Sequence, residues 1–340
     1  YSLVLDRELF NFNVGAWKTP HHFISTQKSK IAAFVHCAKA GIVTIKISKP
    51  ELMASDLKTS ENGGGAKSLH TWTHGREAHA VAIIPPAESD EISHDAAEET
   101  HSDCDFRMYK DSYNPLCLVT GSESGAIHRL SWDRYREIGA RLYDASVVDT
   151  QGAGAAVKCI STVQKSRNKH IVVTGGAKNM LAAFVFEWVK HENDENENDW
   201  RISTKRLVSQ KYVDYAQGRK WSKGVGFVEP KNISDKRIMD ISVFIHEKDT
   251  IRCVTTGSDG EIAIIELDEV SRKFEKIHAT CLNDKPVLSV STVTITANKL
   301  MTFFATGSTD GTVAVWSSID LSMPPLLTFK EAHQSGVNGI

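Results

Sequence analysis

The sequence lacks the features that would place this protein in a membrane or a secretory pathway. No run of 18 apolar residues occurs, so we expect no membrane-spanning helix. The first residues show no charged segment followed by an apolar core, so they predict no signal peptide. The six cysteines are scattered and form no Cys-x-x-Cys pair, which favours reduced thiols and a cytoplasmic location.

Recognisable catalytic patterns are absent as well. Sequence order supports no Ser-His-Asp or Cys-His arrangement. Residues 63–68 read Gly-Gly-Gly-Ala-Lys-Ser, but Ala66 stands where a phosphate-binding loop needs a glycine before its lysine. No cysteine or acid completes a tetrahedral metal set with His70, His74 and His79. We therefore expect no enzymatic activity, no metal and no cofactor.

The chain also lacks a strong net charge. Its 40 basic and 42 acidic residues leave a formal charge of −2. A chain with this charge cannot attract nucleic acid through its overall field, so any RNA contact would depend on a local basic patch. The hydrophobic content of 41% is ordinary for a globular protein.

What the sequence does contain is a repeat. Four segments each run from an apolar stretch into Thr-Gly-Ser or a close variant, then through a turn into a second apolar stretch; they are 118–132, 172–188, 253–267 and 303–318. Their glycines, Gly121, Gly175, Gly257 and Gly307, lie 54, 82 and 50 residues apart. A repeat of about 40–50 residues made of short strands is typical of an all-β propeller with four strands per blade. A weaker fifth copy spans 32–48, so we expect about five blades.

The last copy shows how the turn is built. Asp310-Gly311 is a strong two-residue hairpin signal, because glycine accepts a positive φ and aspartate tolerates it. Apolar residues then alternate up to Trp316 with the period of a strand. In the degenerate second copy, Asn179 is expected at the positive-φ position. The structural turn residues that we predict are Gly121, Gly125, Gly257, Asp259, Gly260, Gly307, Asp310, Gly311 and Trp316.

An inner strand is expected upstream of each turn, at 79–84, 157–163, 238–245 and 287–293, with another at 337–340. His74 and His333 precede two of these strands, and we interpret both as structural loop residues. Ile340 would lie in the middle of an inner strand, so we expect these residues to be part of a larger propeller protein.

These patterns resemble the WD-repeat family along most of the chain. The resemblance depends on the glycine turns and on Trp132, Trp188 and Trp316, which follow the turns at the expected strand ends. Only Trp316 closely follows the family pattern Asp-Gly-x-x-x-x-Trp, so the other blades resemble divergent members of the family.

Two long interruptions break the repeat. Residues 85–115 hold nine acidic residues against Arg107 and Lys110, separate the first two strands of one blade, and are expected to be disordered. The second, 191–236, is expected to be a charged hairpin tip and loop that begins with an acidic tip at 191–199.

Within that second interruption, residues 201–223 carry seven lysines or arginines and one acid. Aromatic residues are interleaved with these cations, as RNA stacking and phosphate neutralisation require. We expect the stretch to be a loop outside the strands, either simply solvated or a functional surface. The RNA-binding candidates are Arg201, Lys205, Arg206, Lys211, Arg219, Lys220, Trp221 and Lys223.

Three segments, 73–84, 235–267 and 330–340, resemble a more specific WD-repeat family, over roughly residues 70–340. Its members are partners of the FtsJ-type tRNA ribose methyltransferase that modifies the wobble nucleotide of the anticodon. The resemblance implies a non-catalytic scaffold that binds the methyltransferase and helps to present tRNA. The acidic insertion at 85–115 departs from that family. A WD-repeat adaptor in another assembly, such as a ubiquitin ligase or a trafficking complex, is the alternative.

Overall fold

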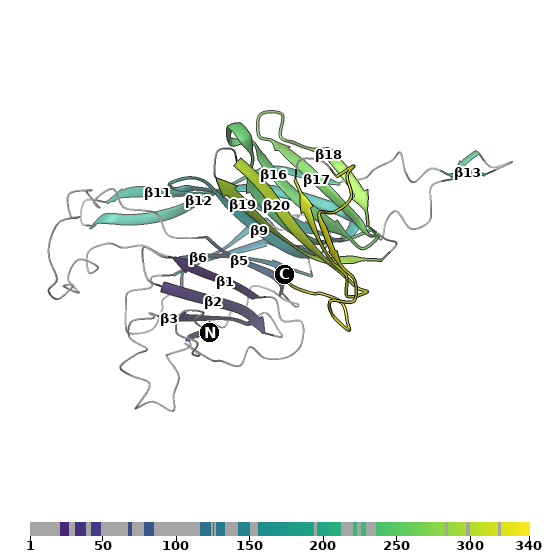
Figure 1. Ribbon diagram of the computed structural model, residues 1–340. Helices are drawn as coiled ribbons and strands as arrows, with labels where there is room; N and C mark the ends of the chain where they lie inside the picture. The colour runs from purple at the N-terminus through teal and green to yellow at the C-terminus, as the bar shows by residue number, and fades with distance from the viewer. Residues whose placement is uncertain are drawn as a thin grey trace, which may run out of the picture.

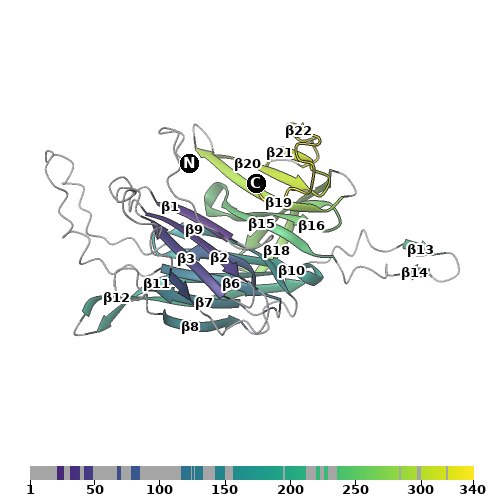
Figure 2. The same cartoon turned by 90° about the horizontal axis from the view of Figure 1, so that it is seen from below.

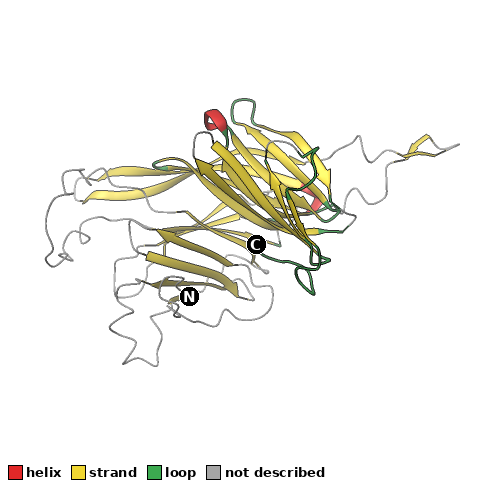
Figure 3. Cartoon of the chain, viewed as in Figure 1, coloured by secondary structure: helices red, strands yellow, loops and turns green. Residues whose placement is uncertain are grey.

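The computed structural model of this chain describes residues 21–26, 31–38, 42–48, 67–69, 78–84, 116–123, 125, 127–132, 142–149, 156–193, 196–211, 220–222, 226–228, 236–282, 285–296, 300–318 and 321–340. Nearly all of these residues lie in strands or the turns between them (Figure 3). The described helical residues form two short 3₁₀ turns, Ala177–Asn179 and Glu247–Asp249. Within this part of the chain, no helix is long and apolar enough to cross a membrane.

Five four-stranded antiparallel sheets follow one another along the chain, which we number as blades 1 to 5 (Figure 1). Blades 1 and 2 consist of β1 (His21–Thr26), β2 (Ile31–Ala38), β3 (Ile42–Ser48) and β4 (Lys67–Leu69), and of β5 (Ala78–Ile84), β6 (Leu116–Ser122), β7 (Ile127–Trp132) and β8 (Leu142–Asp149). Blade 3 consists of β9 (Val157–Ser166), β10 (Lys169–Gly176), β11 (Met180–Asn193) and β12 (Asn196–Lys211). Blades 4 and 5 consist of β15 (Ile238–Ile245), β16 (Ile251–Gly257), β17 (Glu261–Asp268) and β18 (Lys273–Cys281), and of β19 (Val287–Thr296), β20 (Leu300–Ser308), β21 (Val313–Ser317) and β22 (Leu327–Phe329).

The order of contacts between these sheets makes them propeller blades. Within each sheet the strands pair in chain order, and the first strand of each blade contacts the first strand of the next, from β1 through β5, β9 and β15 to β19. This arrangement confirms the all-β propeller. The inner strands predicted at 79–84, 157–163, 238–245 and 287–293 are β5, β9, β15 and β19. Strand β1 and the outer strands β4, β8, β18 and β22 were not predicted.

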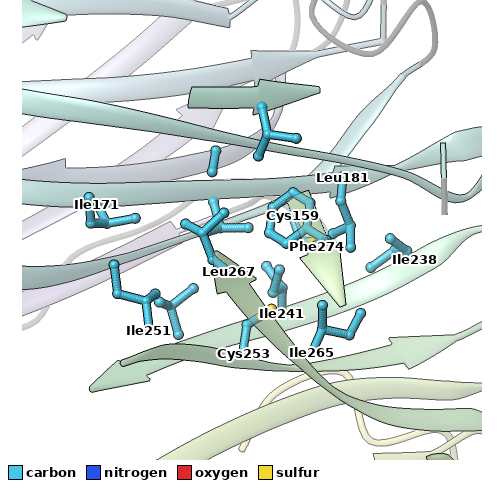
Figure 4. Packing of buried hydrophobic residues seen from close by; sticks show 14 of the residues in the cluster. Cys159, Ile171, Leu181, Ile238, Ile241, Ile251, Cys253, Ile265, Leu267 and Phe274 are labelled. Atoms are coloured by element: carbon cyan, nitrogen blue, oxygen red, sulfur yellow. The ribbon is translucent and has the colours of Figure 1, made fainter. Parts of the chain in front are cut away.

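The core consists of the layers between neighbouring blades. On β10, Ile171 and Val173 pack toward blade 4, whereas Val172 packs toward blade 2. Successive residues of the strand are therefore all buried, because each blade is covered on both of its faces. Figure 4 shows the layer between blades 3 and 4, in which Leu181 faces Phe274 and its neighbours.

Three of the four repeated glycines at the ends of second strands leave space for the segment that follows; at Gly257 a Cβ would instead lie 2.3 Å from Oδ1 of Asp259, in the same blade. A Cβ atom on Gly121 would lie 2.4 Å from Cγ1 of Val157, the first residue of β9. A Cβ on Gly175 would lie 2.8 Å from Cγ2 of Ile238, the first residue of β15. Any larger residue at these two positions would push the next inner strand away. We call this contact the glycine seat.

Gly307 of blade 5 forms the same seat with Val337. A Cβ on Gly307 would lie 2.6 Å from Cβ of Val337, whose backbone N–H donates to Ser308 O at 3.1 Å. Residues 337–340 are nevertheless not a strand, so that prediction was wrong. Val337 occupies the position of a first strand residue, but residues 338–340 have no ladder of backbone hydrogen bonds to a neighbouring strand among the described residues.

The tight turns differ from the seats because they require positive φ. Gly125, Gly260 and Gly311 have φ values of 82°, 84° and 81°, and Asn179 takes 54° in the degenerate turn. Asp310 accepts a hydrogen bond from Thr312 N at 3.0 Å and another from the Ser308 hydroxyl, which together lower the pKa of its carboxyl.

Two residues hold the turn of blade 5 in place: Trp316 on β21 and His333 in the loop after β22. Trp316 Nε1 donates to Thr306 Oγ1 at 2.9 Å, and the indole stacks on Phe304 with ring centroids 6.1 Å apart. His333 N donates to Gly311 O at 3.3 Å, which ties the loop after β22 to the turn. His74 lies outside the described residues.

Polar side chains link the inner strands of neighbouring blades. Ser161 Oγ of blade 3 accepts a hydrogen bond from Val243 N of blade 4 at 3.1 Å. Asp240 of blade 4 accepts from Val290 N of blade 5 at 2.8 Å. An innermost strand has one edge without a neighbouring strand, so these side chains satisfy N–H groups that the sheets leave unpaired.

Gly311→Val should destabilise blade 5. The change forces a β-branched residue into positive φ and places its Cβ 1.9 Å from the carbonyl oxygen of His333. The expected loss in unfolding free energy is on the order of 1–3 kcal/mol, from backbone strain, measured by thermal or denaturant unfolding. Gly339→Val is the control, because a Cβ there meets nothing within 4 Å. Equal stability of the two variants would contradict this account.

Asp240→Asn should change how stability depends on pH. Burial raises the pKa of Asp240 to about 6, although hydrogen bonds from Val290 and Ile241 lower it. An acid whose pKa is raised by folding binds its proton more tightly in the folded state, so stability is lost as pH rises from about 4 to about 6. Between those pH values the wild type should lose on the order of 1–3 kcal/mol relative to the asparagine variant. A constant difference between the two proteins would refute this.

Candidate nucleic-acid interface

The first half of the basic stretch is a strand, not a loop. β12 runs through Lys211 and pairs with β11 along its length, because apolar residues at Ile202 and Val208 pack into the blade core. The expectation of a loop over 201–211 was therefore wrong. A β-bulge between the pairs Ala183–Val208 and Phe184–Arg206 leaves Leu207 without a pair and breaks the alternation of the strand. Lys205 and Arg206 are both exposed. Sequence periodicity missed the strand because this bulge interrupts it.

The two ends of the blades form two faces of the molecule. The turn face carries the turns around Gly125, Asn179, Gly260 and Gly311. The hairpin face lies at the other end of the strands, where β11 and β12 continue to their connection at 194–195, well past the end of β10. β11 continues through Trp188 to Asn193, so Trp188 does not end its strand as the sequence indicated.

The candidate cations are divided between these two faces. Arg201 pairs with Val189 on the hairpin side, whereas Lys211 pairs with Met180 beside the turn face. The two residues are ten positions apart, which corresponds to about 33 Å at the rise of a strand. Lys220 and Trp221 lie on β13 (Lys220–Ser222), which pairs with β14 (Gly226–Val228); Arg219 and Lys223 lie outside the described residues. In both cartoon views the tip of the β11–β12 hairpin and β13 point in opposite directions (Figures 1 and 2).

Lys236 fixes the point at which the basic segment returns to the propeller. Its carbonyl oxygen accepts a hydrogen bond from Asn179 N at 2.8 Å, in the turn of blade 3. Its Nζ lies 2.7 Å from Asp259 Oδ2 and 3.2 Å from Glu261 Oε2, in and beside the turn of blade 4. Burial lowers the pKa of Lys236, but hydrogen bonds and charge from the two carboxylates outweigh this and raise it overall. Lys236 thus joins the turn of blade 3 to the turn of blade 4.

Two further cations flank this joint. Lys178 is exposed in the turn of blade 3, with φ 55°, and Arg237 is exposed next to Lys236. Among the residues that the structure describes, neither side chain has a hydrogen-bond or ion-pair partner. The sequence analysis missed both, because Lys178 stands in a degenerate turn and Arg237 beyond the end of the basic stretch. The hydrogen bond between Asn179 and Lys236 brings their two segments together.

The hairpin face has a different composition. Ile84, where the acidic insertion leaves the propeller, packs in one buried cluster with Trp188 and Ile202 at the base of the β11–β12 hairpin. The Arg129 guanidinium donates to Ile202 O and so attaches blade 2 to the hairpin. Residues 85–115 themselves lie outside the described residues.

The described part of the chain contains no metal site and no reactive thiol among its buried cysteines. No group of three or more His, Cys, Asp or Glu residues there is placed to hold a metal ion. Cys159 and Cys253 are buried, and burial raises the pKa of both thiols, to about 12 for Cys253. Such thiols are poor nucleophiles and behave as core residues.

Comparison with known proteins gives a likeness of fold only. No protein-family model matches this chain, and no curated protein matches it. Among solved structures it is similar to the β-propeller domain of Cps50 (Swd1) from Myceliophteria thermophila, with 10% sequence identity and a TM-score of 0.44. The similarity covers 91% of this chain and 71% of that one. The propeller assignment therefore depends on the strand order and blade contacts described above.

Lys236→Met should destabilise the joint between blades 3 and 4. It removes a partner from the nearly buried Glu261 carboxylate, which keeps only Lys276 at 3.1 Å. A lost hydrogen bond to a charged group costs about 1–3 kcal/mol. The matched control is Lys178→Met, which should change the unfolding free energy by less than about 0.5 kcal/mol. Denaturant unfolding of the two variants measures the difference, and equal values would show that the Lys236 ion pairs contribute nothing.

Proposed function

We propose that this protein is a non-catalytic, cytoplasmic WD-repeat scaffold that binds an FtsJ-type tRNA 2′-O-ribose methyltransferase and helps to present tRNA for methylation of the wobble nucleotide. The resemblance of three segments to partners of that enzyme supports the choice of partner. The observation that carries the RNA contact is the pair of exposed cations Lys205 and Arg206 on β12, a strand that ends at Lys211 beside the turn face.

The physical basis is local rather than global. A chain with a net charge of −2 offers phosphates no general attraction, so contact depends on cations gathered in one region. Lys205 and Arg206 are adjacent on β12 and both are exposed. As an edge strand in the described sheet, β12 presents these side chains without a neighbouring strand to cover them. Aromatic Trp221 follows on β13, which suits stacking on unpaired bases.

The partner can be tested without assuming the RNA contact. When the full-length protein is purified from cells under native conditions, an FtsJ-type methyltransferase should co-purify in stoichiometric amount. Recovery of ubiquitin ligase or trafficking subunits in its place would favour the adaptor alternative.

Replacing Arg206, Lys211, Arg219 and Lys220 by Ala should weaken binding of tRNA to the purified scaffold–methyltransferase complex. Each lost phosphate contact removes up to about 0.9 from the slope of log affinity against log salt on a duplex, and less on single strands. The fold and enzyme co-purification should survive, because Arg206 is exposed and all four residues carry a charge, which buried cores rarely contain. Unchanged tRNA affinity and unchanged wobble methylation would show that the stretch is an ordinary solvated surface.

A further inference from the structure

We propose that tRNA lies on the turn face of the propeller, where Lys178 and Arg237 contact its phosphates at the joint between blades 3 and 4. This inference rests on the proposed function and assigns the RNA to one face. It adds two residues that lie outside the basic stretch.

The topology separates the charged segments of the chain by face. β5 ends and β6 begins at the hairpin face, and the β11–β12 hairpin extends past the same face; segments 85–115 and 191–199 hold nine and five acidic residues against two basic ones. The connection from β12 to β15 leaves and returns at the turn face. Residues 211–237 hold seven basic residues and three acidic ones. An acidic connection therefore starts and ends at the hairpin face, and a basic one starts and ends at the turn face.

The distance between the faces keeps these two fields apart. Arg201 and Lys211 are ten positions apart on β12, which corresponds to about 33 Å. The Debye length at physiological salt is about 8 Å, so the acids of the hairpin face do not neutralise the cations of the turn face. This arrangement favours the approach of a polyanion from the turn face.

At the turn face, Lys178 and Arg237 are two exposed cations whose side chains have no hydrogen-bond or ion-pair partner among the described residues. Neighbouring cations are already engaged, since Lys236 and Lys276 both bind Glu261. The hydrogen bond from Asn179 N to Lys236 O, at 2.8 Å, holds the segments of Lys178 and Arg237 next to each other. Two unpaired cations on a rigid joint lose little freedom on binding, which favours contact with a phosphate backbone.

The test uses the purified scaffold–methyltransferase complex and an unmodified tRNA transcript, with affinity measured over a range of salt concentrations. Lys178→Gln with Arg237→Gln should weaken binding on the order of tenfold near physiological salt and lower the salt slope by about 1.4–1.8 for two contacts. The matched control is Arg272→Gln with Lys273→Gln, which removes two exposed cations from the hairpin-face turn of blade 4. That control should leave both quantities unchanged.

The outcomes separate this inference from the proposed function. Loss of affinity in the Lys178–Arg237 variant only, with the control pair unchanged, supports the turn face. Equal losses in both pairs overturn it, because charge rather than position would then decide binding. If neither pair matters while the four-alanine variant binds weakly, the proposed function stands and this assignment falls. If no variant weakens binding, both are wrong. Melting curves of each variant confirm that the joint remains folded.

Discussion

The packing of successive blades depends on the contact by which blades 2, 3 and 5 hold the first residue of the segment that follows. At Gly121, Gly175 and Gly307 the second strand has no side chain, and a β-branched residue from the following segment occupies that space. Hydrogen bonds from Asp240 and Ser161 then satisfy the inner strand edges across the same boundary. Because the core lies between blades rather than within them, each sheet acquires its two buried faces only through its neighbours.

The sequence predicted those parts of the fold that are encoded locally. Asp-Gly at positions 310 and 311 specifies its turn through backbone preference, and alternating residues mark the strands on either side. The reason for Gly121 and Gly175 is not local, because it lies in a residue from the next blade. The strand over 201–211 escaped notice for a related reason: a bulge shifts its register, and the pairing with β11 outweighs the weak alternation of the segment itself.

The candidate interface was predictable in composition but not in geometry. A count of charges along 201–223 finds the cations, yet only the topology shows that Arg201 and Lys211 lie at opposite ends of one strand. Conversely, Lys178 and Arg237 are 59 residues apart in the sequence and come together through a single backbone hydrogen bond between adjacent residues. In this architecture the connections after the fourth strands and the turns between second and third strands always meet at one face.

Because of the glycine seat, the four-stranded blade that repeats in the sequence is not the same set of residues as the unit that packs together. The packing unit also includes the first residue of the next blade. The side chain that completes blade 3 is Ile238, which the sequence repeat assigns to blade 4. Exchange of a whole blade between two such proteins would therefore separate each glycine from its matching side chain at both boundaries. Recombination within a blade, after its first strand, would keep every seat and its occupant on the same piece of chain.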